Sequence, residues 1–108
     1  MATRTPKKLA QTTLSTSMTA VYTAPSGTVT QITEIWVSNT NTTSARKISI
    51  AAHGTATANV LIPVQEIAEN GYATFSDSKI VLAAGEVLAG KVDTGTDVNI
   101  TVYGIEEA

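Results

Sequence analysis

Residues 33–54 read TEIWVSNTNTTSARKISIAAHG and contain two segments of alternating apolar and polar residues, joined by a loop of Asn, Thr and Ser. In the first segment, which begins near Thr30, the alternation places Ile35 and Val37 on one face and puts Ile32 and Trp36 on the other. In the second segment, the alternating sets are Ile48, Ile50 and Ala52 against Lys47, Ser49 and Ala51. The stretch therefore predicts two half-buried strands joined by a polar turn. The sequence leaves open whether the loop at 38–44 also binds a ligand.

The same period of two continues along the rest of the chain. Val98, Ile100 and Val102 alternate with Asn99, Thr101 and Tyr103. Turn sequences such as APSG, ENG and DTGTD separate further strand candidates at Leu9–Thr16, Ala20–Ala24, Asn59–Val64, Tyr72–Ser76, Ile80–Ala83 and Glu86–Val92. The pattern predicts an all-β fold, namely a single-domain β-sandwich or jelly roll of about eight short antiparallel strands. Only VQEIAEN, at Val64–Asn70, predicts a helical turn or two.

Length and composition exclude several classes of protein. A chain of 108 residues builds one domain with one modest core. It has no Cys, which excludes disulfides, thiolate nucleophiles and Cys-bearing zinc sites. It has neither an apolar run of 18 residues nor the apolar segment of a signal peptide, so we expect a soluble protein with no membrane partner.

Charge is distributed unevenly along the chain. Arg4, Lys7 and Lys8 are three of the seven cations, and they precede a body in which carboxylates predominate. We therefore divide the chain into a basic N-terminal arm, residues 1–8, and a β-sandwich domain, residues 9–108. Pro6 favours an extended arm over a helix, and we expect the arm to be mobile until its three cations meet carboxylates on a partner. An acidic body without interleaved basic and aromatic residues does not predict nucleic-acid binding.

Three motifs suggest chemistry, but none meets its full requirements. Gly85–Lys91 has the spacing of a phosphate-binding loop, yet Val92 stands where a hydroxyl should reach magnesium, so we expect a strand after a Gly turn. Asp93 and Asp97 flank Gly95 but supply too few oxygens for calcium, and a hairpin turn is the preferred interpretation. His53 could act as a catalytic base, but the sequence shows no identifiable nucleophile or orienting residue to act with it. We expect no enzyme activity, no cofactor and no metal.

Trp36 is the one aromatic residue that the pattern singles out. It is the only Trp of the chain, and it is predicted to be either part of the core or the buried anchor of an interface. A small core gains stability by association, so we expect a homo-oligomer. The candidate partner-binding residues are therefore Arg4, Lys7, Lys8 and Trp36.

Several segments together resemble small β-sandwich virion proteins of tailed bacteriophages. They are YTAPSG at Tyr22–Gly27, ITEIWVSNT at Ile32–Thr40, AAGEVL at Ala83–Leu88 and VNITVYGIEE at Val98–Glu107. Such patterns occur in head decoration (cement) proteins, head fibres and tail-tip parts. No catalytic or ligand-binding residue is carried over, because the likeness lies in turns and strands.

The resemblance implies a non-enzymatic subunit, a trimer or other small ring, that binds the major capsid protein on the outer surface of the head. Such a protein is made in the cytoplasm of the host bacterium. The alternative is a tail or fibre module for host attachment or tail assembly. A small sugar-binding or sugar-processing jelly-roll enzyme is a third possibility, but the clustered carboxylates or His ligands that it needs are not apparent in the sequence.

Overall fold

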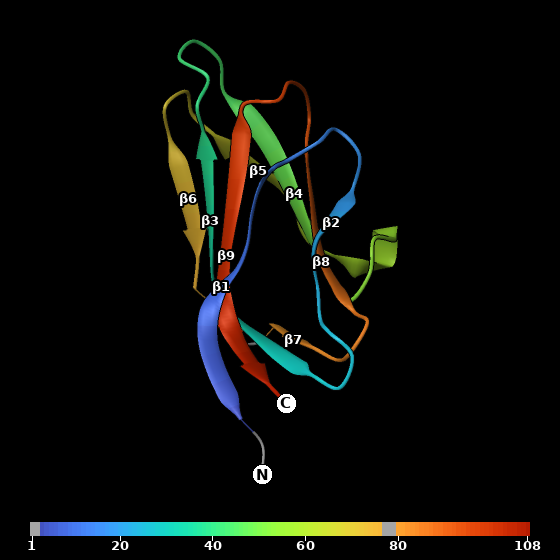
Figure 1. Ribbon diagram of the computed structural model, residues 1–108. Helices are drawn as coiled ribbons and strands as arrows, with labels where there is room; N and C mark the ends of the chain where they lie inside the picture. Colours follow the sequence, from blue (N-terminus) through green and yellow to red (C-terminus); the bar gives the residue numbers. More distant parts are fainter. Residues whose placement is uncertain (1–2, 77–79) are drawn as a thin grey trace.

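The computed structural model describes residues 3–76 and 80–108 and confirms the all-β fold (Figure 1). The described residues form nine strands, in agreement with the prediction of about eight, and one 3-10 turn, η1 (Thr57–Asn59). The strands are β1 (Arg4–Thr13), β2 (Thr19–Thr23), β3 (Val29–Asn39), β4 (Arg46–Ala52), β5 (Val60–Ile67), β6 (Tyr72–Phe75), β7 (Ile80–Leu82), β8 (Val87–Val92) and β9 (Val98–Glu107). No helix among the described residues is long and apolar enough to cross a membrane.

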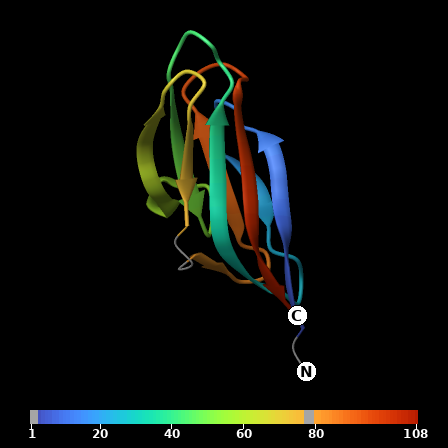
Figure 2. The same cartoon turned by 90° about the vertical axis from the view of Figure 1, so that its left-hand side faces the viewer.

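The strands form two antiparallel sheets packed face to face (Figures 1 and 2). The five-stranded sheet has the order β1-β9-β3-β6, with β7 also paired to β3, and the four-stranded sheet has the order β2-β8-β4-β5. The molecule measures 51 × 25 × 19 Å, and the first and last described residues, Thr3 and Ala108, lie at the same tip of its long axis (Figure 1). The β-sandwich predicted from the alternation is therefore confirmed.

The core fills the space between the sheets with aliphatic side chains. The predicted inward set of β9, Val98, Ile100 and Val102, is fully buried, as are Ile48 and Ile50 of β4. Val37 and Leu88 complete the contact from β3 and β8. The period of two therefore identified the buried face of the central strands correctly.

One prediction within β3 is wrong, because Ile32 lies on the same face as Ile35. Both side chains are buried, whereas the strict alternation had placed Ile32 beside Trp36. The pairing between β3 and β9 shifts register between Ile32 and Glu34, so Thr33 is an extra residue that returns Ile32 to the core. A second register shift, between Lys8 and Ala10, occurs where β1 faces the same part of β9.

Gly104 of β9 lies between these two irregularities. A Cβ atom there would overlap the carbonyl oxygen of Gln31 and lie 2.6 Å from Cδ1 of Leu9. The missing side chain therefore lets β3 and β1 approach β9 closely at the point where the five-stranded sheet bends.

The predicted boundary at residue 8 needs correction. Residues 4–8 are not a separate arm but the first half of β1, and they pair with β9 from Arg4 opposite Glu107 to Lys8 opposite Tyr103. Thr3 and Ala108 extend this pairing through two backbone hydrogen bonds of 3.0 Å. Pro6 is tolerated because β1 is an edge strand, where a residue without an N–H need not break a hydrogen bond between strands. Residues 1 and 2 lie outside the described residues.

The predicted helical turn at Val64–Asn70 is also wrong. Val64 to Ile67 belong to β5, where Gln65 pairs with Ile48 and Ile67 pairs with Arg46. Ile67 is buried, so its contact with the core fixes a strand where the local sequence was compatible with a helix. The chain then turns through Asn70, whose φ is 55°.

Candidate functional site

The outer faces of the two sheets differ in what they expose. On the four-stranded sheet, the outward residues Ser49, Ala51 and Ala89 are buried, and the segment after β4 contributes Thr55 and Thr57 to the lining of a hollow over that face. On the five-stranded sheet, the outward face carries large exposed side chains. Five of the seven large apolar side chains that are exposed among the described residues lie here: Val29, Trp36, Tyr72, Val81 and Tyr103. We call this surface the outer face.

The aromatic part of the outer face centres on Trp36. Its indole ring stacks on the ring of Tyr72, with centroids 5.5 Å apart and planes 19° apart. The indole N–H donates to the carboxylate of Glu34, and the hydroxyl of Ser76 lies 3.4 Å from the same carboxylate. Tyr103 is paired in register with Glu34. These contacts hold the rings in fixed orientations while leaving them open to solvent.

The aliphatic part of the outer face lies nearer the chain ends. Val29, Val81 and Ile105 line a shallow hollow of about 230 Å³ with Gln31 and the Arg4–Glu107 ion pair, whose closest atoms are 3.4 Å apart. The charged side chains of the outer face within the described residues are Arg4, Lys8, Glu34 and Glu107, two of each sign. An extended and nearly neutral surface that exposes aromatic and aliphatic side chains among uncharged polar ones is typical of a protein contact.

The structure places three of the four predicted partner-binding residues on the same face of the five-stranded sheet. Arg4, Lys8 and Trp36 lie on the outer face, and Lys8 donates to the side chain of Gln11 at 2.9 Å. Lys7 lies on the opposite face of β1, where its Nζ is 2.7 Å from Glu106. The three cations therefore do not act as one basic cluster, because neighbouring residues of a strand point to opposite faces.

Glu106 also holds a buried hydroxyl group in place. The Tyr22 hydroxyl donates to Glu106 at 2.6 Å and lies 2.8 Å from the hydroxyl of Thr30. Burial, together with the Glu106 contact, raises the pKa of Tyr22 to about 12, and the Lys7 ammonium followed by the Tyr22 hydroxyl lowers the pKa of Glu106. The hydrogen bonds and the ion pair among these groups connect the end of β9 to strands of both sheets.

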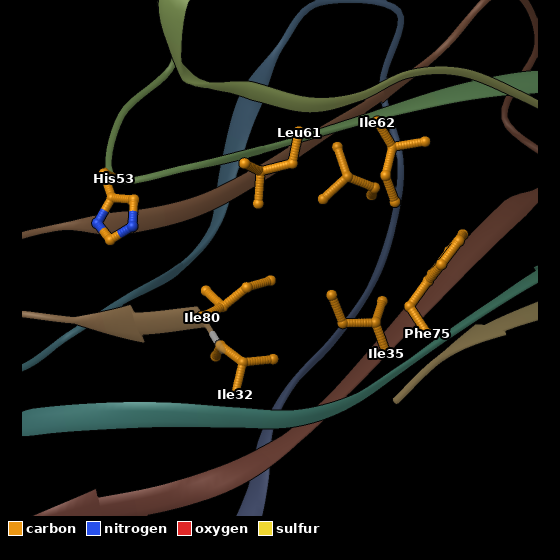
Figure 3. Close-up of a pocket in the computed structure, with 8 residues that line it drawn as sticks. Ile32, Ile35, His53, Leu61, Ile62, Phe75 and Ile80 are labelled. Carbon is orange, nitrogen blue, oxygen red and sulfur yellow. The ribbon is translucent and has the colours of Figure 1, made fainter. Parts of the chain in front are cut away.

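An apolar slot opens between the sheets on the side of β5, β6 and β7 (Figure 3). Its volume is about 460 Å³, and it is lined by Ile32, Ile35, Ile50, His53, Leu61, Ile62, Phe75 and Ile80. His53 is the one polar side chain of this lining and has a φ of 73°. Its Nδ1 is 3.0 Å from Glu86, whose pKa is lowered first by the N–H of Ala83 and then by the His53 ring.

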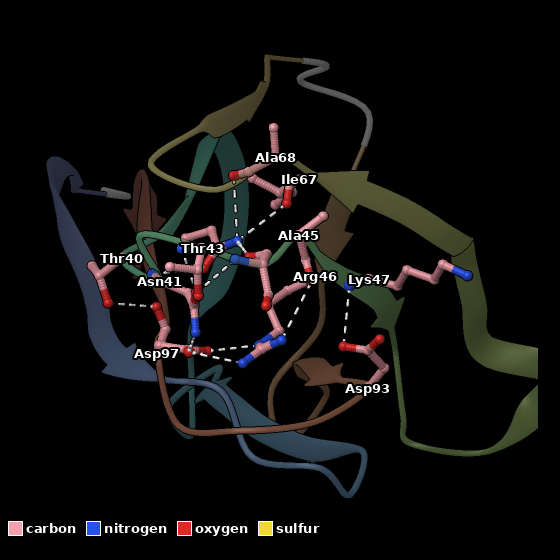
Figure 4. A network of polar contacts seen from close by, with 12 residues as sticks. Thr40, Asn41, Thr43, Ala45, Arg46, Lys47, Ile67, Ala68, Asp93 and Asp97 are labelled. Atoms are coloured by element: carbon pink, nitrogen blue, oxygen red, sulfur yellow. Dashed lines mark hydrogen bonds and ion pairs between the residues drawn. The ribbon is translucent and has the colours of Figure 1, made fainter.

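In the Asn, Thr and Ser loop, the side-chain amides form hydrogen bonds within the protein (Figure 4). Asn39 donates to the carbonyl oxygens of Ser44, Ile67 and Ala68, while Asn41 donates to Asp97 at 2.7 Å and accepts N–H groups of its own loop. Arg46 donates to both carboxylate oxygens of Asp97, at 3.0 and 3.1 Å, and lowers the pKa of Asp97. The connection between two strands is therefore confirmed as a self-bonded turn.

The other two motifs also have structural uses. Gly85, with a φ of 86°, lies in a turn before strand β8, so the phosphate-loop spacing falls on a turn and a strand, as expected. The predicted hairpin turn at residues 93–97 is wrong, because β8 and β9 belong to different sheets and this segment crosses between them. Asp93 accepts the backbone N–H of Lys47 at 3.1 Å, whereas Asp97 binds Arg46. No group of three or more His, Cys, Asp or Glu residues within the described part of the chain could hold a metal ion.

Tyr72 and Tyr103 were not singled out by the sequence. Tyr103 alternates with buried residues of β9, and Tyr72 alternates with the partly buried Ala73 and Phe75 of β6, so the alternation was the available signal for exposure. Their convergence with Trp36 depends on the pairing of β6 and β9 on either side of β3, which local patterns do not specify.

Comparison with known proteins gives a likeness in fold. No protein-family model and no curated relative matches the chain. Among solved structures, the chain is similar to one in the acidic stable capsid structure of Helicobacter pylori bacteriophage KHP30, with a TM-score of 0.56 and 14% sequence identity. The alignment covers 100% of this chain and 94% of that chain. At this identity the likeness shows a shared fold.

Proposed function

We propose that this protein is a non-enzymatic structural subunit of a tailed-phage virion that decorates the outside of the head and binds the major capsid protein. The likeness to a chain from a phage capsid and the resemblance of its segments to virion proteins support this role. The observation that carries it is the outer face, because a face of this kind serves protein contact. A homo-oligomer such as a trimer, made in the host cytoplasm and then fixed to the virion surface, belongs to the same proposal.

The size of the outer face suits a stable protein contact. Strands lie about 4.8 Å apart and rise about 3.4 Å per residue, so three strands of ten or eleven residues together with the short β6 and β7 cover roughly 600 Å². A standard interface buries about 800 Å² on each partner. One face of this small domain therefore supplies most of the area of a standard contact with a capsid subunit.

The absence of enzyme activity is part of the proposal and is supported by the surroundings of the chemically active groups. His53 is tied to Glu86, Asp97 to Arg46, and Glu106 to Lys7 and Tyr22. These contacts link separate strands and loops, and within the described residues no Ser or Thr hydroxyl bonds to His53 as a catalytic triad would need.

The strand order supports the jelly-roll form of the sandwich. In the order β1-β9-β3-β6 facing β2-β8-β4-β5, the chain changes sheet between β1 and β2, between β2 and β3, and between β3 and β4. Two Greek keys wound in this way make a double-sheet jelly roll, an architecture that viral capsid domains use.

A head-binding experiment tests the proposed function. The protein is added to purified phage heads that lack it, and bound protein is measured by sedimentation for the wild type, Tyr103→Ala and Val64→Ala. Tyr103 lies on the outer face, whereas Val64 is similarly exposed but lies on β5, so Val64→Ala is the matched control. We expect Tyr103→Ala to weaken binding about 30-fold, as loss of an aromatic anchor does, and the control to bind normally.

Two results would contradict the proposal. Equal binding of Tyr103→Ala and wild type would remove the outer face from the capsid contact. Failure of the wild type to bind heads, together with binding to host cells or labelling of the tail, would favour the tail or fibre module instead.

A further inference from the structure

The apolar slot has the properties of a receptor for an apolar group. Its floor is formed by buried Ile32, Ile35 and Ile50, while Leu61 stands half-exposed at its rim. A dry cavity of about 150 Å³ lined by Leu, Ile and Phe is enough to bind benzene. The slot has about 460 Å³, which leaves room for an aromatic ring.

The one polar side chain of the slot specifies the kind of group that would fit. The Glu86 carboxylate can only accept, so Nδ1 of His53 carries the proton, and Nε2 of the neutral ring is an acceptor. No described residue bonds Nε2. A suitable occupant therefore has an apolar ring and a hydroxyl or N–H donor, and it has no negative charge, because an anionic group would be repelled by Glu86.

Tyr72 has the complementary properties. It is the most exposed aromatic side chain among the described residues, at 68%, and it lies on the edge strand β6. Its hydroxyl bonds to no described residue, and stacking on Trp36 orients its ring before any contact forms. Fixing a side chain in advance lowers the entropic cost of binding.

Tyr72 cannot occupy the slot of its own molecule. Phe75 of the same strand lines the slot from the inner side of the five-stranded sheet, whereas Tyr72 lies on the outer face. A Tyr72 side chain that enters a slot must therefore come from another molecule. Two different surfaces of one protein then meet, which is a heterologous contact that can close into a ring.

We propose that Tyr72 of one copy inserts into the apolar slot of a second copy. There its hydroxyl group donates a hydrogen bond to Nε2 of His53. The contact buries a Tyr in a preformed pocket, the arrangement typical of interface hot spots. It names the self-association surface of the subunit proposed above and so rests on that function, but it can fail while head binding remains. The remainder of the outer face, including Tyr103, stays available to the capsid.

Complementation between two variants tests the proposal. Tyr72→Ala removes the inserted ring and keeps the slot, whereas Leu61→Asp places a charge at the slot rim and keeps Tyr72. We expect each variant alone to self-associate about 30-fold more weakly than wild type in analytical ultracentrifugation. Mixed in equal amounts, they contain one intact Tyr72 and one intact slot, so we expect a one-to-one heterodimer. Tyr72→Phe, which loses only the hydroxyl, should weaken association about fivefold.

The controls separate this contact from other effects. Val64→Asp introduces the same charge on β5 outside the slot lining, and Tyr103→Ala removes an aromatic ring elsewhere on the outer face; both should associate like wild type. Circular dichroism checks that each variant is folded. If Leu61→Asp does not fold, the self-association of Tyr72→Ala and Tyr72→Phe still shows whether Tyr72 forms the contact.

Three outcomes would overturn the proposal. They are a wild type that remains monomeric at about 100 µM, a Tyr72→Ala variant that assembles like wild type, and two folded monomeric variants whose mixture forms no heterodimer. A monomer that still binds phage heads would refute only this contact and leave the proposed function standing.

Discussion

Gly104→Ala should destabilise the sandwich more than any other Gly→Ala substitution within a strand. The new methyl group would overlap the carbonyl oxygen of Gln31 and lie 2.6 Å from Cδ1 of Leu9. The carbonyl belongs to β3, which is paired with β9 on that side, so relief requires a backbone shift. Overpacking of this kind costs up to about 3 kcal/mol, and the loss of unfolded-state freedom on replacing Gly returns roughly 0.4–1 kcal/mol. We expect a net loss of about 2 kcal/mol.

Gly90→Ala is the matched control, because Gly90 is also inside a strand but its nearest neighbours are side-chain ends. A Cβ there would lie 3.0 Å from Cδ2 of Leu14 and 3.4 Å from Cδ1 of Ile50, and both groups can rotate away. Urea denaturation followed by circular dichroism should show less than half the loss for Gly90→Ala. In thermal melts, Gly104→Ala should lower Tm by roughly 8–12 °C. A Gly104→Ala variant within about 0.5 kcal/mol of wild type would refute the reasoning, as would a larger loss for Gly90→Ala.

Three further predictions concern polar groups. Tyr22→Phe leaves Thr30 and Glu106 without their shared hydroxyl, so we expect a loss of about 1–3 kcal/mol in urea denaturation, and an unchanged midpoint would contradict the network. Because Arg46 holds the folded pKa of Asp97 below its ordinary value of 3.8, the stabilisation is present above that value and is lost as pH falls through the folded pKa. Asp97→Asn should therefore be less stable than wild type at pH 7 and lose less stability between pH 5 and pH 3, and parallel pH profiles would argue against the pair. A chelator should leave Tm unchanged, since a metal bound only by the folded state would stabilise it, and a sharp fall would reveal such an ion.

The period of two in the sequence predicted most of the fold, and it failed where a strand gains a residue. It identified the buried sets of β4 and β9 because those strands have no extra residue in the predicted segments. It misplaced Ile32 because the register shift beside Thr33 depends on the partner strand β9. A bulge is a property of two strands together, so the pattern of one strand cannot reveal it.

The candidate site was partly predictable for a related reason. Trp36 was identified as an interface anchor or a core residue from its type and rarity, and the structure shows that it is exposed. Arg4, Lys7 and Lys8 were grouped because they are close in sequence, but the pairing of β1 with β9 sends Lys7 to the opposite face. Tyr72 and the apolar slot depend on the order of strands in both sheets, which is set by contacts between distant residues.

The position of β9 between β1 and β3 has a consequence for synthesis on the ribosome. Residues 98–107 leave the ribosome after all other strands, yet they supply the pairing partner for β1 and for most of β3. Until then the inward side chains of β3, such as Ile35 and Val37, have no completed sheet around them. Pairings between strands that are distant in sequence, such as β3 and β9, form in milliseconds to seconds. The nascent chain therefore carries an apolar strand with one edge unpaired until β9 is made, and expression at lower temperature or with added chaperones should raise the soluble yield.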